Sequence, residues 1–355
     1  IPALLYAISY MPHTPLSARI PDLSPTIASL VERCLQKRPE DRYSGGAELA
    51  RDLQQALRNR NATRSNLTPA PRRAAPSGSP EIRYCRTADG VPIAYAVHGS
   101  GPTLVRVLGW FTHLEMEWEW PALRLIWERL GETHTVVRYD GRGIGLSGPW
   151  TQEFTEETRQ LDLDAVLNAI RADQVALFGI SEGGWSAAHY AAHHPDRVNR
   201  LIIYGSYSRG MQFRPGYDAD ETRALETLMR KGWGRDTPQY RQIFTTAYFG
   251  ADADPGLVAH FNQLQRAAAD GDTAARYQES LNRRPDGHDV FASIRTPTLV
   301  IHCRDDQIVS FEEGRLIAAI VPGAQFIPFP TGTHYFPVED AITMRMAEAI
   351  TRFTH

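Results

Sequence analysis

From Glu81 onward, short apolar runs alternate with longer stretches in which apolar residues recur at helical spacing. The first stretch, YCRTADGVPIAYAVHG, predicts a hairpin that turns at Asp89-Gly90, a typical hairpin dipeptide. The later runs suit strands buried on both faces, as in parallel sheets. The later runs are TLVRVLGW, HTVVRYDG, QVALFGIS, RLIIYGSY and TPTLVIHCRD. Because parallel strands are joined by helical crossovers, the alternation predicts an α/β fold with a doubly wound, mostly parallel sheet.

The strand pattern is interrupted between Ser208 and about Asp289, where the sequence has helical periodicity instead. We interpret this interruption, about residues 208–290, as a helical cap inserted into a domain that spans 81–355.

The chain before this domain divides into two parts. Residues 1–58 have apolar stripes of helical period, and Ser24 followed by Pro25 is a typical helix start. Residues 59–80 are rich in Pro, Ser, Thr, Asn and Arg and have almost no apolar periodicity, which indicates a linker. The predicted order is therefore a small helical segment, a linker and the α/β domain.

Composition narrows the class of protein. The 355 residues carry a formal net charge of -3, and the absence of basic runs argues against nucleic acid as the main partner. Cys34, Cys85 and Cys303 show no spacing typical of a metal site, so we expect no metal and a reducing, cytoplasmic setting. The apolar start, residues 1–11, is shorter than a membrane span and has no basic flank, which predicts neither export nor a membrane anchor.

One glycine-rich stretch, residues 179–183, carries candidate chemistry. Its sequence GISEG fits G-x-S-x-G, with an apolar run before it and an amphipathic helical stretch after it. A sharp strand-to-helix turn leaves no room for Cβ atoms beside the serine and exposes the hydroxyl at a helix N-terminus. A plain glycine bend would explain the glycines but not their flanks. We therefore predict that Ser181 is a nucleophile.

A serine hydroxyl needs a base that removes its proton and a carboxylate that orients the base. Among the twelve histidines, His334 is the predicted base because it lies in a glycine-containing loop after a late strand-like stretch. Asp305 and Asp306 follow the last strong apolar run, and we expect one of them to orient His334.

Negative charge on an attacked carbonyl oxygen requires N–H donors that are already in place. We expect one from the backbone of Glu182 and one from Trp110, with Phe111 as the alternative to Trp110. The Glu182 carboxylate should turn away from the reacting centre, toward an arginine or solvent. The chain has no phosphate-binding motif of the GxxxxGK[ST] type, and YDGRGIGLSGP is more typical of a structural loop, so we expect no cofactor.

With these motifs placed, residues 81–355 resemble the α/β-hydrolase superfamily over their whole length. The segments LGW, YDGRGIGLSGP, GISEGG, TPTLVIHCRDDQIVSFEEGR and GTHYFPVED occur in family order. The resemblance implies that the second aspartate of the R-D-D-x-x-V stretch orients the histidine, which favours Asp306 over Asp305. WFTHLEMEWEWP with GISEGG and YGSY is similar to a bacterial esterase-like subgroup often fused to signalling modules such as adenylate cyclases. The family's usual His-Gly before the oxyanion donor is Leu108-Gly109 here.

The amino-terminal segment has a resemblance of its own. CLQKRPEDRY and its surroundings are similar to the last helices of a bacterial serine/threonine protein kinase C-lobe, with Arg42 at the position of a family arginine. The Gly-rich loop, the β3 lysine, HRD and DFG do not occur in this chain, so no phosphoryl transfer is expected. Two interpretations stay open: the segment is a fragment of a longer kinase-hydrolase fusion, or it is a kinase remnant kept for another use, such as covering the hydrolase or mediating assembly.

The expected substrate follows from the aromatic residues of the cap and the oxyanion loop. We predict that Phe111, Trp233 and Phe244 contact a small or medium acyl ester in an apolar pocket. The function predicted is carboxylic-ester hydrolysis through a covalent acyl-enzyme. Lactone, amide, carbon-carbon or perhydrolase chemistry, or a ligand-sensing module of a signalling kinase, are the alternatives. Two partner hypotheses stay open: a homo-oligomer, and a contact between the kinase-like segment and the hydrolase.

Overall fold

The computed structural model describes residues 25–46, 48–53, 80–107, 109–250, 253–330, 333–335 and 340–355. The chain divides into two units, 1–77 and 78–355. In the first unit, α3 (Pro25–Cys34) and a short 3-10 helix (Pro39–Asp41) are described. The first 24 residues of the kinase-like segment, and nearly all of the expected linker, lie outside the described residues.

The second unit is built on an eight-stranded sheet in the order β1-β2-β4-β3-β5-β6-β7-β8. The first two neighbouring pairs, β1 with β2 and β2 with β4, are antiparallel, and every other pair is parallel. This confirms the predicted doubly wound, mostly parallel sheet. The strands are β1 (Ile82–Arg86), β2 (Pro92–Gly99), β3 (Thr103–Val107), β4 (Thr135–Tyr139), β5 (Val175–Ile180), β6 (Val198–Tyr204), β7 (Thr298–Cys303) and β8 (Gln325–Phe329).

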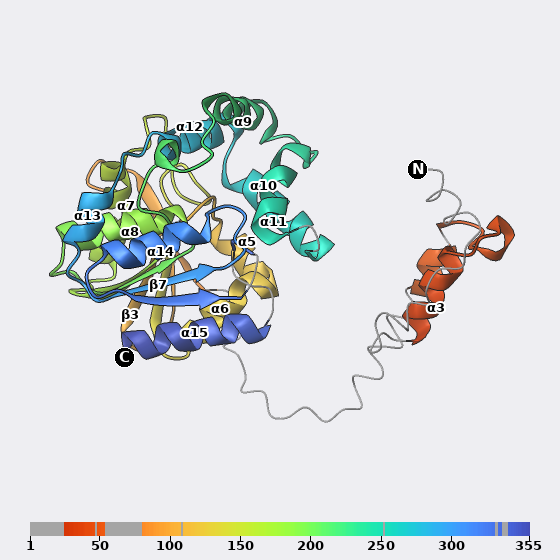
Figure 1. Ribbon diagram of the computed structural model, residues 1–355, viewed down its shortest axis with the longest axis horizontal. Coiled ribbons are helices and arrows are strands. Elements are labelled where there is room, and N and C mark those ends of the chain that lie inside the picture. The colour runs from red at the N-terminus through yellow and green to blue at the C-terminus, as the bar shows by residue number, and fades with distance from the viewer. Residues whose placement is uncertain are drawn as a thin grey trace. The chain divides into compact units, whose positions relative to one another are not determined.

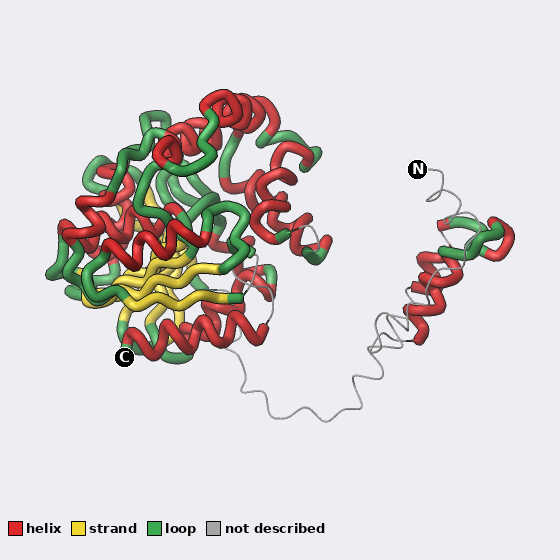
Figure 2. The backbone as a smooth tube through the Cα atoms, viewed as in Figure 1, coloured by secondary structure: helices red, strands yellow, loops and turns green. Residues whose placement is uncertain are grey.

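Helices cover both faces of the sheet, as Figures 1 and 2 show. On one face, α6 contacts β2 and β4, and α15 packs against α6 and β6. On the other face, α7 contacts β1 and β2, α8 contacts β5 and β6, and α14 contacts β7 and β8. The bounds are α5 (Leu114–Glu119), α6 (Pro121–Gly131), α7 (Glu156–Ala169), α8 (Glu182–His193), α13 (His288–Ser293), α14 (Phe311–Ile320) and α15 (Asp340–Thr354).

The central strands are buried because helices cover them on both sides. All residues of β5 and of β7 are buried, as the continuous apolar runs predict. Since β3, β5, β6 and β7 are parallel neighbours, the loops that follow them leave the sheet at the same edge. Loops at this edge are where open α/β sheets bind ligands.

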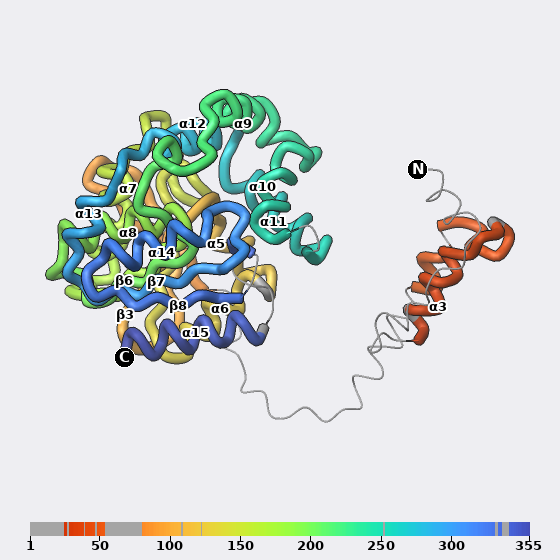
Figure 3. Tube along the Cα trace, viewed as in Figure 1, coloured from red at the N-terminus to blue at the C-terminus, as the bar shows by residue number. Residues whose placement is uncertain are grey.

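Five α-helices of the described chain lie between β6 and β7: α13 packs against α8 and α14, and the other four, here called the cap, stand beyond that edge of the sheet (Figure 3). The cap helices are α9 (Ala219–Gly232), α10 (Gln239–Phe249), α11 (Pro255–Ala268) and α12 (Gly271–Asn282). Aspartates at the N-caps of α9, α11 and α12 accept backbone N–H bonds, which fixes where each helix begins. A search of the described helices for one with the length and apolarity needed to span a membrane finds none.

Candidate active site

Ser181 lies at the turn between β5 and α8, as the N-cap residue of that helix. Its φ of 52° is in the left-handed region, which non-glycine residues adopt mainly where the surroundings enforce it. The glycines on either side allow the turn: a Cβ on Gly179 would lie 2.5 Å from the Cα of Gly184. The strand, the tight turn and the helix therefore hold the Ser181 side chain at the sheet edge.

His334 and Asp306 converge on this serine from two other loops. The His334 Nε2 atom lies 2.9 Å from Ser181 Oγ, and His334 Nδ1 lies 2.7 Å from Asp306 Oδ2. All three residues are at most 9% exposed. The structure thus brings together the three residues predicted as nucleophile, base and orienting carboxylate in one hydrogen-bonded row.

The Asp306 carboxylate is held on both of its oxygens. Its Oδ1 accepts the backbone N–H groups of Ile308 and Val309, at 2.8 and 2.9 Å, and Oδ2 faces His334. Burial favours the neutral acid, but the charge and hydrogen bond of His334 together with the N–H of Val309 outweigh it and lower the pKa of Asp306. Asp305, the alternative carboxylate, is exposed to solvent. Asp306 is therefore the ionised partner of His334.

A second histidine lies under the same carboxylate. His302, in β7, is fully buried, and its Nε2 lies 3.6 Å from Asp306 Oδ2 and 2.9 Å from the carbonyl oxygen of Val309. Burial lowers the pKa of His302, which keeps it neutral and able to donate to the carbonyl. This side chain supports the Asp306 loop from below.

The two expected N–H donors stand at the ends of neighbouring strands. Glu182 begins α8, and Trp110 follows the end of β3, with a φ of 25°. Gly109 is packed so closely on the carbonyl of Ile180 that a Cβ would collide with it. Within the part of the chain that the structure describes, no hydrogen-bond acceptor takes the N–H of Trp110 or of Glu182. Both donors are therefore available beside Ser181.

The Glu182 side chain corrects part of an expectation. It does not turn to solvent, because it is 3% exposed and accepts a hydrogen bond from the phenol of Tyr277 in α12. The charges of Arg284 and Arg159 act on it, but no ion pair joins it to an arginine among the described residues. Its backbone carbonyl accepts a bond of 3.2 Å from Arg284 Nη1. Burial raises the pKa of Glu182 despite the nearby charges of Arg284 and Arg159. Sequence reasoning missed Tyr277 and Arg284, because no motif marks a cap residue that reaches the strand-to-helix turn at Ser181, here called the elbow.

A cavity of about 430 Å³ opens over Ser181. Apolar side chains from the cap and the β7 loop form most of its lining, together with a smaller polar group that includes Arg214 and Glu221. Phe244 and Trp110 line it, with their rings stacked 5.5 Å apart. Phe111 and Trp233 are buried behind Trp110 and do not line it, which corrects the expectation that all three predicted aromatics face the substrate cavity.

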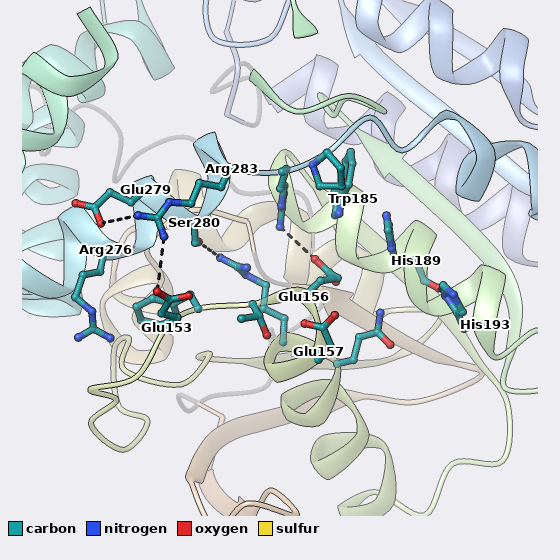
Figure 4. Close-up of a pocket in the computed structure, with 16 residues that line it drawn as sticks. Glu153, Glu156, Glu157, Trp185, His189, His193, Arg276, Glu279, Ser280 and Arg283 are labelled. Carbon is teal, nitrogen blue, oxygen red and sulfur yellow. Dashed lines mark hydrogen bonds and ion pairs between the residues drawn. The ribbon is translucent and has the colours of Figure 1, made fainter. Parts of the chain in front are cut away.

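A larger cavity, about 690 Å³, lies beside α7 and α8 and does not include Ser181 (Figure 4). Its charged groups are mostly paired with one another: Arg283 lies 3.7 Å from Glu153, and Arg284 lies 3.5 Å from Glu156. Size alone would indicate this cavity as the substrate site, but the hydrogen-bonded row of Ser181, His334 and Asp306 lies at the smaller cavity and indicates that one. Among the described residues, no cluster of histidine, cysteine and acidic side chains is arranged to hold a metal ion.

Comparison with known proteins agrees with this fold. A family described as alpha/beta hydrolase fold matches residues 102–341, more than half of the chain. The protein therefore belongs to the α/β-hydrolase family. Over 291 residues it is 27% identical to 2-hydroxymuconate semialdehyde hydrolase from Pseudomonas sp. (strain CF600), covering 75% of this chain and 92% of the relative.

One further relative and one solved structure agree with this assignment to the family's fold. The Bifunctional esterase/perhydrolase DCH from Acinetobacter calcoaceticus is 25% identical over 269 residues, which cover 74% of this chain and 96% of that protein. The solved structure of an esterase from Exiguobacterium antarcticum superposes with a TM-score of 0.67 at 22% identity, covering 78% of this chain and 100% of that one. The chain is thus a hydrolase-family protein similar to enzymes of several activities.

Proposed function

We propose that this protein hydrolyses carboxylic esters with small or medium acyl groups through a covalent acyl-enzyme. The single observation that supports this most is the row of hydrogen bonds from Ser181 through His334 to Asp306. His334 Nε2 removes the hydroxyl proton as Ser181 Oγ attacks the ester carbonyl, and then gives that proton to the departing alcohol. Asp306 stabilises the imidazolium, and water activated by His334 releases the acid.

The oxyanion of the tetrahedral intermediate would bind the backbone N–H groups of Glu182 and Trp110. Their lack of an acceptor among the described residues supports this role, because donors fixed before the reaction need no reorganisation during it. The dipole of α8, which begins at Glu182, would add to the same stabilisation.

The size and lining of the cavity support an ester of modest length. A volume of about 430 Å³ lies within the range of small-molecule sites, and rings such as Phe244 and Tyr248 would pack on an apolar acyl chain. One of the two relatives is named a 2-hydroxymuconate semialdehyde hydrolase and the other a bifunctional esterase/perhydrolase. At 25% to 27% identity these names support a nucleophilic hydrolase and leave the bond to be tested.

The test is hydrolysis of p-nitrophenyl esters of graded acyl length by the full chain and by its Ser181→Ala variant. We expect the wild type to release p-nitrophenol with a maximum at short or medium acyl length and the variant to lose on the order of a millionfold in kcat. Full activity in the variant would refute the role of Ser181. Tight binding of esters without any turnover by the wild type would instead favour a ligand-sensing module.

A further inference from the structure

Arg214 lines the cavity over Ser181 with its guanidinium held in a fixed plane. The group lies over the ring of Tyr207, 3.5 Å from the ring centroid. Its Nε donates to the carbonyl oxygen of Arg209 at 3.0 Å, and the Arg209 side chain itself makes three hydrogen bonds to Glu313. Stacking fixes the plane and the Nε bond fixes the rotation. The guanidinium also makes a side-chain hydrogen bond with Tyr207, but among the described residues no carboxylate pairs with it.

The charge of Arg214 has no carboxylate partner in the described part of the chain. Glu313, a nearby acid, is already paired with Arg209 at 2.7 Å. Glu182, which lines the same cavity, accepts the phenol of Tyr277. Burial lowers the pKa of Arg214, although Tyr207 and Glu313 oppose the effect. A guanidinium stays protonated in proteins, so this half-buried cation lacks an anion.

We propose that Arg214 binds a carboxylate group of the substrate, so that the preferred ester carries one negative charge at a distance from the bond that is cleaved. This inference rests on the proposed ester hydrolysis at Ser181. A planar fork of two N–H groups matches the two oxygens of a carboxylate. A phosphate monoester would bring nearly two charges to one arginine, which favours the carboxylate. The apolar lining takes the methylene chain between the two ends.

Two p-nitrophenyl esters of equal acyl carbon number test the proposal: the hexanoate, which is neutral, and the half-ester of adipate, which ends in a carboxylate. For Arg214→Gln, we expect kcat/KM for the adipate half-ester to fall about tenfold to a hundredfold more than kcat/KM for the hexanoate, as expected for loss of a charge-assisted bidentate bond. The ratio of kcat/KM for the adipate half-ester to kcat/KM for the hexanoate then describes each variant. Arg214→Lys keeps the charge but not the planar fork of two N–H groups, so its ratio should lie between those of the wild type and Arg214→Gln. Enzyme-free rates are subtracted for both esters.

Two matched variants show whether the effect belongs to this arginine. Arg283→Gln removes an exposed arginine from the other cavity and should leave the ratio of the two esters within about twofold. Glu221→Gln removes the exposed carboxylate of the Ser181 cavity. It should raise the ratio slightly, through weaker repulsion of the anionic ester. A rise as large as the fall in Arg214→Gln would instead identify Glu221 as the partner of Arg214 and overturn the proposal.

The outcomes separate this inference from the proposed function. If wild type cleaves both esters and Arg214→Gln reduces both equally, the anion subsite is refuted while ester hydrolysis stands. If the wild type cleaves neither ester, the proposed function fails first. If Arg214→Gln does not fold, a measurement on the wild type alone still tests the proposal. The kcat/KM of the wild type for monomethyl adipate should exceed that for dimethyl adipate by about tenfold or more. Equal rates on these two compounds would refute the subsite.

Discussion

Tyr277 donates a hydrogen bond to the carboxyl group of Glu182, the residue that directly follows Ser181. The two residues are 95 positions apart in the chain and come from α12 of the cap and from the start of α8. Both are buried, at 1% and 3% exposure. This bond ties the cap to the elbow that carries the candidate nucleophile.

Removing the hydroxyl group of Tyr277 should therefore destabilise the unit that spans residues 78–355. Tyr277→Phe leaves a buried carboxyl oxygen without its donor, and we expect a loss of about 1–3 kcal/mol in the free energy of unfolding. Urea titration followed by circular dichroism measures this loss. Tyr84→Phe is the matched control, because Tyr84 is 59% exposed and should change stability by less than about 0.5 kcal/mol. Equal effects of the two changes would contradict the role of the bond.

The raised pKa of Glu182 predicts a pH dependence with a definite sign. Burial makes the folded state favour the protonated acid, so its contribution to stability is present below the unfolded pKa of about 4.3. That contribution is lost as the pH rises through the folded pKa. Glu182→Gln cannot ionise, so the stability of the variant relative to wild type should increase as the pH rises. A difference that is constant between acidic and neutral pH would contradict this assignment.

The contacts of Asp306 predict a loss of rate without a loss of fold. Asp306→Asn keeps an oxygen that can accept the N–H groups of Ile308 and Val309, but it no longer offers a carboxylate to His334. We expect kcat for a p-nitrophenyl ester to fall on the order of ten thousandfold, with the far-ultraviolet spectrum unchanged. Asp305→Asn, at the exposed neighbouring position, should retain nearly full activity. A comparable loss in Asp305→Asn would reassign the carboxylate.

The backbone at the elbow has no space for one more carbon atom. A Cβ on Gly179 would lie 2.5 Å from Gly184 Cα and 2.6 Å from the carbonyl oxygen of Gly183, and backbone atoms cannot rotate away. We expect Gly179→Ala to lower the free energy of unfolding by about 1–3 kcal/mol and to lower kcat by moving Ser181. Gly234→Ala is the control, because its new Cβ would meet nothing closer than 4.0 Å. Thermal melting of the two variants measures the difference.

Glu117 is the shared carboxylate of two buried arginines. It lies 2.6 Å from Arg106 Nη1 and 3.3 Å from Arg138 Nη1, and all three side chains are at most 2% exposed. Glu117→Gln leaves both cations without a carboxylate, and we expect a loss of about 3–5 kcal/mol in the free energy of unfolding. The phenol of Tyr335 also donates to Glu117, so the loop that carries His334 should become less ordered.

Chemical denaturation of Glu117→Gln, with the exposed Glu115→Gln as control, measures the effect. Equal denaturation midpoints for the two variants would show that groups other than Glu117 compensate the charges of Arg106 and Arg138.

Most of the fold could be predicted because its signals are local. Each central strand is an apolar run, and Asp89-Gly90 turns between β1 and β2 with a Gly90 φ of 89°. The elbow at Ser181 could also be recognised, because glycine spacing between a strand and a helix is a property of adjacent residues. Position after a late strand predicts His334 and the pair Asp305-Asp306, because parallel strands bring such positions to one edge, and the resemblance to the family then favours Asp306.

The cavity lining could not be predicted, because it depends on how the cap helices are oriented. Aromatic content alone did not separate Phe244, which lines the cavity, from Trp233, whose indole donates to the carbonyl of Gln265 inside the cap. Arg214 has no motif either. Its stacking on Tyr207 depends on the fold of the loop that leads from β6 into the cap.

By itself, the sequence determined the sheet, the class of fold and the residues that compose the candidate row, since periodicity, turn chemistry and order along the chain are encoded by neighbouring positions. Only the tertiary structure decided what each buried charge faces. Glu182 meets Tyr277, and Arg214 has no carboxylate partner among the described residues, because burial and pairing depend on side chains that arrive from distant segments. A carboxylate or guanidinium looks the same in sequence whether its partner is solvent, protein or substrate.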